Sequence, residues 1–242
     1  MSIVLSPYSI YSSITNNGLI LHLDASNPLS YSGSGNTWFN LASNSSHGTL
    51  VNGVAYENIN GGTFVFDGVN GSVNGSIEGS IFRGDFTQSA WIYRTGTGIW
   101  HGIFTNSNPA TNYTYVMTFS DRTTTTPYNF LGINVLGVSP SGVFLDVGSH
   151  LNKWLFITIT KSQNLLNIYC YKDGSLLQNS GILSWNNGNF ATTNNYMVGR
   201  HWAGTDVQPF RGNIAHISLY NRSLAPQEIN YNFNVTRKRF GV

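Results

Sequence analysis

The sequence predicts an all-β protein, built as a two-sheet antiparallel sandwich with one short helix near its C-terminus. Three observations support this fold class: short runs with a two-residue period recur along the 242-residue chain, 14% aromatic residues are combined with 26 glycines, and helical periodicity is almost absent. Alternation is typical of strands with one buried face, and glycine suits the tight turns between them. This length is ordinary for a single sandwich domain.

Seven runs have the strand pattern, with alternating apolar residues or a mixture of β-branched and aromatic side chains. In chain order they are Leu19–Leu23, Thr63–Phe66, Ser89–Tyr93, Tyr115–Phe119, Trp154–Thr160, Asn167–Tyr171 and Ile214–Tyr220. Nearly every residue of Trp154–Thr160 is apolar or β-branched, which predicts the centre of a sheet. Its hairpin partner is expected at Leu166–Tyr171, because Ser162–Asn164 has the composition of a turn.

Turns, loops and one helix are predicted between and after these runs. The helix candidate is Ala225–Tyr231, with Ser223 as its expected cap and Pro226 near its start. Tight turns are expected at Asn16–Gly18, Asp173–Gly174 and Asn186–Asn189, and loops at Asn27–Asn36, Thr105–Asn112 and Asp121–Pro127. Residues 17–236 are therefore expected to form one sandwich, preceded by an arm or edge strand (1–16) and followed by a basic tail (237–242).

Composition also excludes several classes of function. Charged residues make up 9% of the chain and the formal net charge is +2, so nucleic acid bound through phosphate neutralisation is not expected. Cys170, the single cysteine, is expected to be a buried, inert thiol. The start of the sequence lacks a basic signal-peptide region, and no apolar run approaches the roughly 20 residues that span a bilayer. We therefore expect a soluble protein without a signal peptide or membrane insertion.

Read in order, seven blocks resemble the laminin G-like, concanavalin A-like lectin/glucanase domains, which are jelly-roll sandwiches. The opening blocks are Gly18–Ala25, Ser30–Leu41 and Gly48–Leu50; Phe66–Val69, Gln88–Ile92 and Leu151–Trp154 follow, and Phe210–Leu224 closes the domain. The closing block is the most specific. Its continuation, Thr236–Gly241, is similar to versions found in tailed-phage and other viral structural proteins. The resemblance implies the sandwich fold and suggests a virion component.

The same fold hosts glycoside hydrolases, which need two carboxylates about 5–5.5 Å or about 6.5–9.5 Å apart. In such sandwich hydrolases the pair lies on one strand as Glu-X-Asp-X-X-Glu. Here no two of the ten acidic residues are closer than seven positions in sequence, so that strand pair is absent. Nucleophile elbows, phosphate-binding loops and closely spaced histidine pairs are absent too. We therefore expect a protein that is not an enzyme.

No cofactor is expected, although a structural calcium ion has to be considered. Many relatives hold Ca²⁺ with Asp, Asn and backbone carbonyls, and Asp24 and Asp67 resemble conserved acids of the family. However, Ala215 and His216 stand where many relatives have acids. The favoured interpretation is that both aspartates accept hydrogen bonds from turn amides.

Two segments combine an aromatic plate with polar neighbours, as sugar recognition requires. The candidate carbohydrate-binding residues are Trp100, His101, Arg200, His201, Trp202 and Asp206. Trp202 is expected to stack on a pyranose ring, with Arg200, His201 and Asp206 donating or accepting hydrogen bonds. The competing interpretation is that both tryptophans are simply buried.

The leading hypothesis is a non-catalytic virion structural protein, such as a capsid decoration, fibre or tail component. Its lectin-like domain would contact cell-surface glycans, other virion proteins or copies of itself. The short basic run Arg237–Arg239, followed by Phe240 and Val242, is expected to dock onto a protein partner. The alternatives are a stand-alone carbohydrate-binding module and a glycoside hydrolase.

Overall fold

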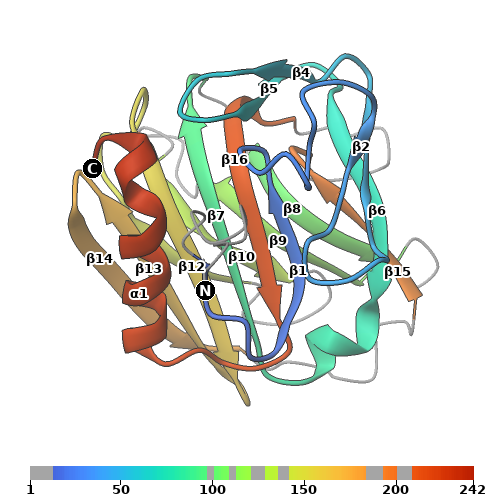
Figure 1. Cartoon of the computed structure of the whole chain (residues 1–242). Coiled ribbons are helices and arrows are strands. Elements are labelled where there is room, and N and C mark those ends of the chain that lie inside the picture. The colour runs from blue at the N-terminus through green and yellow to red at the C-terminus, as the bar shows by residue number, and fades with distance from the viewer. Residues whose placement is uncertain are drawn as a thin grey trace, which may run out of the picture.

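A computed structural model of the chain describes residues 13–96, 101–108, 113–120, 129–135, 142–183, 193–200 and 209–242. In this part of the chain two eight-stranded antiparallel sheets pack face to face as a sandwich (Figure 1). The predicted fold class is confirmed. All seven predicted strand runs lie within observed strands.

The first sheet carries the C-terminal helix on its outer face. Its order is β14 (Ser175–Ile182), β13 (Leu165–Lys172), β12 (Trp154–Ser162), β7 (Phe86–Arg94), β16 (Arg211–Tyr220), β5 (Thr63–Asp67) and β4 (Ala55–Glu57), with β1 (Leu19–Asp24) also pairing with β16. Strand β12 is interior and pairs with β13, as its composition predicts. The turn between them contains Gln163 with a φ of 54°, a left-handed conformation typical of tight hairpins.

The second sheet has the order β11 (Gly142–Asp146), β10 (Phe130–Val135), β9 (Tyr113–Ser120), β8 (His101–Asn108), β15 (Thr193–Val198), β6 (Ser72–Glu78), β3 (Gly48–Val51) and β2 (Thr37–Trp38). A short 3₁₀ helix, Gly79–Arg83, follows β6. One expectation is wrong here: Thr105–Asn108 continue β8 instead of beginning a loop. The rest of that predicted loop, the predicted loop 121–127 and the predicted turn 186–189 lie outside the described residues, as does most of the arm.

The main core fills the space between the two sheets with alternating strand residues. Trp38 packs edge-on against Phe64, with ring centroids 4.6 Å apart, and both side chains are fully buried. Cys170 is also buried in this core. Burial raises the pKa of its thiol to about 12, so the thiol stays protonated and unreactive, as predicted.

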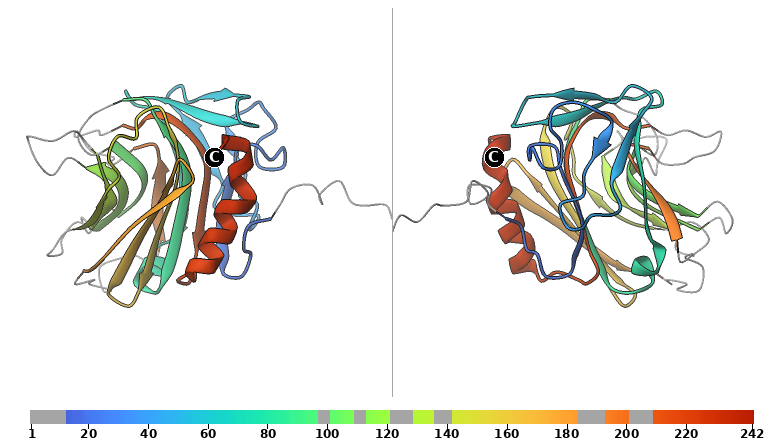
Figure 2. Two further views of the ribbon diagram at one scale, coloured as in Figure 1. Left: turned by 90° about the vertical axis from the view of Figure 1, so that its left-hand side faces the viewer. Right: turned by 45° about the vertical axis from the view of Figure 1, so that its right-hand side comes forward.

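A second hydrophobic cluster lies on the outer face of the first sheet, beneath helix α1 (Pro226–Thr236) and a 3₁₀ helix, Arg237–Phe240. Trp91 of β7 stacks on Phe240 at 4.1 Å, and Tyr171 of β13 stacks on Phe233 at 4.0 Å. The Trp91 indole also donates a 2.8 Å hydrogen bond to Thr236 Oγ1. Figure 2 shows the helix lying against this sheet, on the side away from the other sheet.

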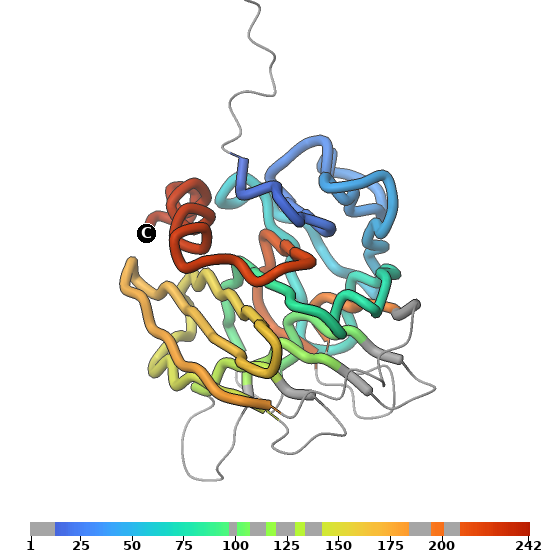
Figure 3. The backbone as a smooth tube through the Cα atoms, turned by 90° about the horizontal axis from the view of Figure 1, so that it is seen from below, coloured from blue at the N-terminus to red at the C-terminus, as the bar shows by residue number. Residues whose placement is uncertain are grey.

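The helix departs from the sequence prediction at both ends. Its N-cap is Ala225, not Ser223, and the Ala225 amide donates instead to the Glu228 side chain at 2.9 Å. At the other end the chain continues helically to Phe240, which is buried within the chain. Phe240 is therefore not presented to a partner in this structure. In Figure 3 this segment and the N-terminal strand β1 lie on the same side of the sandwich.

Candidate functional site

Beyond the helix, the outer face of the first sheet continues over β13 and β14. Their pairing places Asn167 opposite Ser180, and Tyr169 opposite Gln178. Side chains alternate across a strand, so Tyr169 projects from the same face as Tyr171, which packs under α1. The four polar residues therefore share the face that carries the helix.

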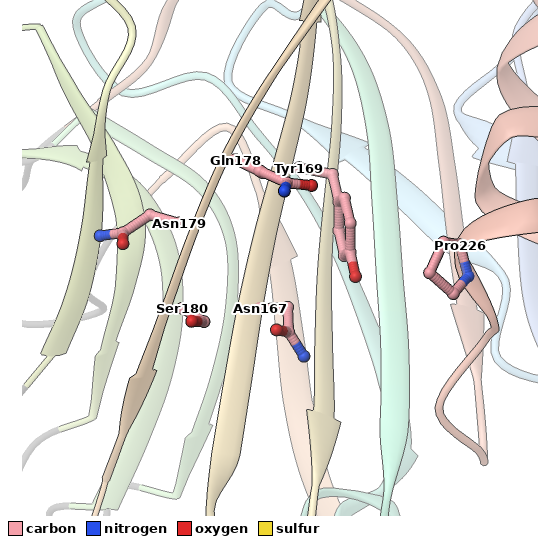
Figure 4. Close-up of a pocket in the computed structure, with 6 residues that line it drawn as sticks. All are labelled: Asn167, Tyr169, Gln178, Asn179, Ser180 and Pro226. Atoms are coloured by element: carbon pink, nitrogen blue, oxygen red, sulfur yellow. The ribbon is translucent and has the colours of Figure 1, made fainter.

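These residues line a groove of about 410 Å³ together with Pro226, the first residue of α1. In Figure 4 Tyr169 lies between the sheet and Pro226, with Gln178 beside it and Asn167 below. Asn179 points the opposite way, and its amide donates a 2.6 Å hydrogen bond to the Phe144 carbonyl oxygen of β11. Asn179 also lines part of the groove, but its amide is committed to the bond with β11, whereas the side chains of Gln178 and Ser180 face the groove.

The polar groups of the groove are uncommitted within the described part of the chain. No hydrogen bond engages the phenol of Tyr169, the amide of Gln178 or the hydroxyl of Ser180 there, and the Asn167 amide makes one long contact, 3.4 Å, with Thr160 Oγ1. Burial raises the pKa of Tyr169, so its phenol is protonated at neutral pH. The groove therefore offers an aromatic ring, amides and hydroxyls with both donor and acceptor capacity.

No charged side chain is among the described lining residues of the groove. A neutral, amphipathic ligand with hydroxyl groups on its edges and an apolar face fits this chemistry. A saccharide ring has both features, since its axial C–H groups stack on aromatic rings and its hydroxyls pair with amides.

Of the six residues predicted from the sequence, the structure describes two, Arg200 and His101. Trp100, His201, Trp202 and Asp206 lie outside the described residues. Arg200 is half-buried, forms an isolated β-bridge with Pro209, and accepts a 2.7 Å hydrogen bond from Thr105 through its carbonyl oxygen. Because Thr105 is on the same strand as His101, the structure brings Arg200 alongside the strand that carries His101.

His101 itself is buried and engaged inside the molecule. Its Nδ1 accepts a 3.3 Å hydrogen bond from Arg94 Nε, while Arg94 Nη1 lies 2.9 Å from His150 Nε2. The Phe119 ring stacks parallel to His150 at 4.6 Å, and the Arg94 guanidinium lies over the same ring. Burial lowers the pKa of both histidines to about 4, with Arg94 adding to the shift, so both are neutral acceptors. In this arrangement His101 acts in a structural cluster rather than on the surface.

The residues considered for calcium do not fit a calcium site. Asp24 Oδ1 accepts a 2.7 Å hydrogen bond from Arg239 Nη1 and a 2.9 Å bond from the Ser26 amide, while Asp67 Oδ1 accepts one from the Val69 amide at 2.8 Å. Both aspartates therefore bind turn amides, as the favoured interpretation held. A guanidinium already neutralises Asp24, and the described residues contain no cluster of three metal-binding side chains.

Several of the described carboxylates are likewise engaged by other partners. Glu228 pairs with Arg222, Asp173 with Lys153, and Asp85 accepts a 2.7 Å bond from the Gln163 amide. Burial acts to raise the pKa of Asp24, but the charges of Arg239, His216 and His22 outweigh it and hold this pKa at about 2. The hydrogen bond from Arg222 likewise lowers the pKa of Glu228. Neither group resembles a general acid, whose pKa must be raised.

The groove was not predicted, although the sequence contains a signal for it. Asp173–Gly174 forms a two-residue turn with φ values of 52° and 77°. A turn of this length fixes the register of the hairpin, so Tyr169 has to face Gln178 and Asn167 has to face Ser180. The missing information was which face of the hairpin the helix leaves open.

Comparisons with known proteins agree with this lectin-type sandwich. Residues 67–230, more than half of the chain, match the family model of the concanavalin A-like lectin/glucanases superfamily. The protein therefore belongs to this superfamily, which confirms the resemblance seen in its sequence. No curated protein matches the chain. No helix among the described residues is long and apolar enough to cross a membrane.

Solved structures with the same fold include sugar-bound proteins. Domain 4 of an extracellular GH43 arabinanase from Geobacillus stearothermophilus, in complex with arabinotriose, has a TM-score of 0.64 at 14% identity, with 88% of this chain and 97% of that chain covered. Trypanosoma rangeli sialidase in complex with sialic acid has a TM-score of 0.66 at 15% identity, covering 97% and 35%. The binding domain of Botulinum neurotoxin DC in complex with SialylT has 0.62 at 17%, covering 91% and 52%. At these identities the likeness concerns the fold, and the chain spans about a third of the sialidase.

Proposed function

We propose that the protein is a non-catalytic glycan-binding domain, and that the groove between β13, β14 and Pro226 is its binding site. The single observation that carries this proposal is the set of uncommitted polar groups beside the half-buried ring of Tyr169. A ligand that removes water from these groups without hydrogen-bonding to them loses affinity. The groove therefore favours a ligand rich in hydroxyl groups.

The absence of catalysis is part of the proposal. It is supported by the lowered pKa values of Asp24 and Glu228 and by their engagement with arginines. A glycosidase needs one carboxylic acid that stays protonated near neutral pH and a second carboxylate beside it. Release of reducing sugar that disappears on substitution of one carboxylate would contradict this part.

Substitution of Tyr169 tests the binding site. On a glycan array, Tyr169→Ala should abolish the binding profile, because a central aromatic ring contributes about 2 kcal/mol or more at a binding hot spot. Tyr169→Phe keeps the stacking surface and should retain part of the affinity. Tyr231→Ala removes an exposed tyrosine on α1 whose side chain faces Ser13, and serves as the matched control. An unchanged profile for folded Tyr169→Ala would remove the groove from consideration.

The biological setting we propose is a virion, in which the domain is a capsid decoration, fibre or tail component. The similarity of the C-terminal block to viral structural proteins supports this, as does the exposed edge strand β14. Around that edge Ile182 is 71% exposed, and Leu176 and Leu165 are 44% and 43% exposed. In the described chain β14 pairs as a strand only with β13, and β11 lies against its other edge at Asn179, so a strand from a second copy can add only at the exposed end of β14 beside Ile182.

Edge pairing and glycan binding are compatible in one molecule. Strand addition uses backbone groups in the plane of the sheet, whereas the groove side chains project from its face. Ile182→Lys should therefore weaken self-association, measured by sedimentation, without changing glycan binding. A protein that stays monomeric at high concentration and never occurs in purified particles would favour the alternative, a stand-alone carbohydrate-binding module.

A further inference from the structure

A second hollow, of about 320 Å³, lies between two loops that share no residue with the groove. It is lined by residues that include Ser26, Tyr31, Ser32, Tyr56, Asn58 and Gly61. The first loop follows β1, and the second joins β4 to β5. None of the described lining residues carries a charge at neutral pH.

Two tyrosine rings form the aromatic wall of this hollow. Their centroids are 5.0 Å apart, and both rings pack against the buried ring of Phe64. Tyr31 is 6% exposed and its phenol donates to the Gly35 carbonyl oxygen at 2.9 Å, so its position is fixed. The Tyr56 phenol and the Asn58 amide make no hydrogen bond in the described chain and are available to a ligand.

The two loops are joined by one cation, the guanidinium of Arg239. Four oxygens accept its hydrogen bonds: Asp24 Oδ1 at 2.7 Å, Ser26 Oγ at 2.6 Å, and the carbonyl oxygens of Asn60 and Gly62 at 2.9 Å each. Asp24 ends β1 and Ser26 lies in the loop that follows it, whereas the last two oxygens belong to the loop between β4 and β5. A planar fork of donors can span such a set, whereas a single ammonium cannot.

The loops also touch directly at Gly62, which has a φ of 134°. A Cβ atom there would lie 2.3 Å from the Ala25 carbonyl oxygen and 2.6 Å from the Tyr56 hydroxyl. Tyr56 therefore lies at the contact between the two loops, which the hydrogen bonds of Arg239 also join. Because Arg239 follows α1, the C-terminal segment is part of this construction.

We propose that this hollow is a second saccharide-binding site, specific for a neutral sugar unit, and that Arg239 is its positioning residue. A neutral ligand is favoured because the guanidinium donates into the loops and is not among the described lining residues. The inference shares with the proposed function only the class of ligand, so either site can fail without the other. Two sites on one domain would raise its avidity for branched or clustered glycans.

The test is a titration with three neutral probes, arabinotriose, maltotriose and cellotriose, followed by NMR of the tyrosine rings and amides. Wild-type protein should show two separate sets of perturbed signals. Tyr169→Ala should keep only the set around Tyr56, Tyr56→Ala only the set around Tyr169, and the double variant neither. Loss of all binding in Tyr169→Ala, with no change in Tyr56→Ala, would overturn this inference and leave the groove intact.

The converse result, loss of all binding in Tyr56→Ala alone, would support the hollow and contradict the groove. If none of the probes perturbs either set at about 10 mM, well above ordinary millimolar affinities, both sites are refuted.

Variants at Arg239 test its positioning role. Arg239→Ala should weaken binding at the hollow by at least about tenfold, a cost of about 1.4 kcal/mol. Arg239→Lys should recover only part of this affinity, and binding at the groove should persist in both variants, which shows that the fold is intact. Lys238→Ala removes the exposed neighbouring cation and should change nothing. Equal affinity at the hollow in wild type and Arg239→Ala would contradict the role of Arg239.

Discussion

Two halves of one sheet face differ in what covers them. Over β7, β12 and β13 the outer face of the first sheet is aromatic and sealed by the C-terminal segment, with Trp91, Phe156 and Tyr171 beneath Phe233 and Phe240. Over β13 and β14 the same face is polar, and Tyr169 lies open beside Gln178. Tyr171 and Tyr169 are two residues apart on one strand, yet Tyr171 is buried against Phe233, whereas Tyr169 is only partly buried at the edge of the same cluster and also lines the groove.

The difference shows that helix position, rather than residue type, assigns the role of each tyrosine. Proline has no backbone N–H and fixes its own φ, so Pro226 is suited to the first turn of α1. Because the helix begins there, the sheet beyond it remains open. The start of the helix then becomes one wall of the groove.

The largest expected effect on stability comes from a substitution in the half of the face that the C-terminal segment covers. Trp91→Ala should lower the free energy of unfolding by about 3–5 kcal/mol, because it removes a fully buried indole and the hydrogen bond to Thr236. Urea unfolding measures this change. Tyr169→Ala, the matched substitution at the edge of the covered half, should cost less than Trp91→Ala, because the Tyr169 side chain is only partly buried. Equal losses for the two variants would contradict the division of the face.

The next largest effect should come from acid, which should lower the stability of the fold without changing glycan binding at the groove. Burial lowers the pKa of His216 to about 3 from an ordinary 6.5; His22 and Arg239 add to the shift and Asp24 opposes it. A histidine held neutral stabilises the fold above pH 6.5, and this contribution is lost as the pH falls from 6.5 towards 3. The loss is up to about 1.4 kcal/mol per pH unit for one such group.

The contribution of Asp24 to stability also falls in acid. Its pKa is lowered to about 2, so the ionised carboxylate stabilises the fold above pH 3.8, and this contribution is lost as the pH falls through 2. Unfolding measured between pH 7 and pH 4 should show the loss from His216 together with those from His101 and His150, and His216→Phe should remove its share and make the loss shallower. Glycan affinity at the groove should stay constant from pH 8 to pH 5, because Tyr169 remains protonated there. An affinity that follows a histidine titration would refute the neutral groove.

The smallest expected effect concerns two neighbouring residues on opposite faces of β14. Gln178→Ala should leave stability within about 0.5 kcal/mol and weaken glycan binding several-fold, because it removes one ligand hydrogen bond. Asn179→Ala should do the reverse: it should cost about 1 kcal/mol of stability through the lost bond to Phe144 and leave affinity unchanged. Isothermal titration and urea unfolding of both variants check the pair. The same outcome for both would argue against the assignment of faces.

The sequence allowed the strands, the β12–β13 hairpin and the fold class to be predicted, because two-residue periodicity and turn residues are local signals. It did not reveal the extent of the C-terminal helix. Arg237–Arg239 resembles a solvated basic tail, but Phe240 lies on Trp91 and Arg239 reaches Asp24, a residue 215 positions earlier. Contacts at such separation have no local pattern.

The candidate site was harder to predict for the same reason. A tryptophan next to polar residues is conspicuous in a sequence, which drew attention to Trp100 and Trp202. The proposed groove consists of one tyrosine and ordinary polar residues, which become distinctive only when the hairpin is paired and the helix leaves them open. The binding roles of Trp100 and Trp202 stay a prediction. The buried Arg94–His101 contact illustrates the converse, since a polar residue beside Trp100 serves the interior.

The most direct measurement is a crystal structure of the protein soaked with a neutral oligosaccharide selected on a glycan array. We expect a sugar ring stacked on Tyr169, with its hydroxyls hydrogen-bonded to Gln178 and Asn167 and its far edge towards Pro226. A saccharide bound around Arg200 or Trp202, with Tyr169 uncontacted, would contradict this expectation.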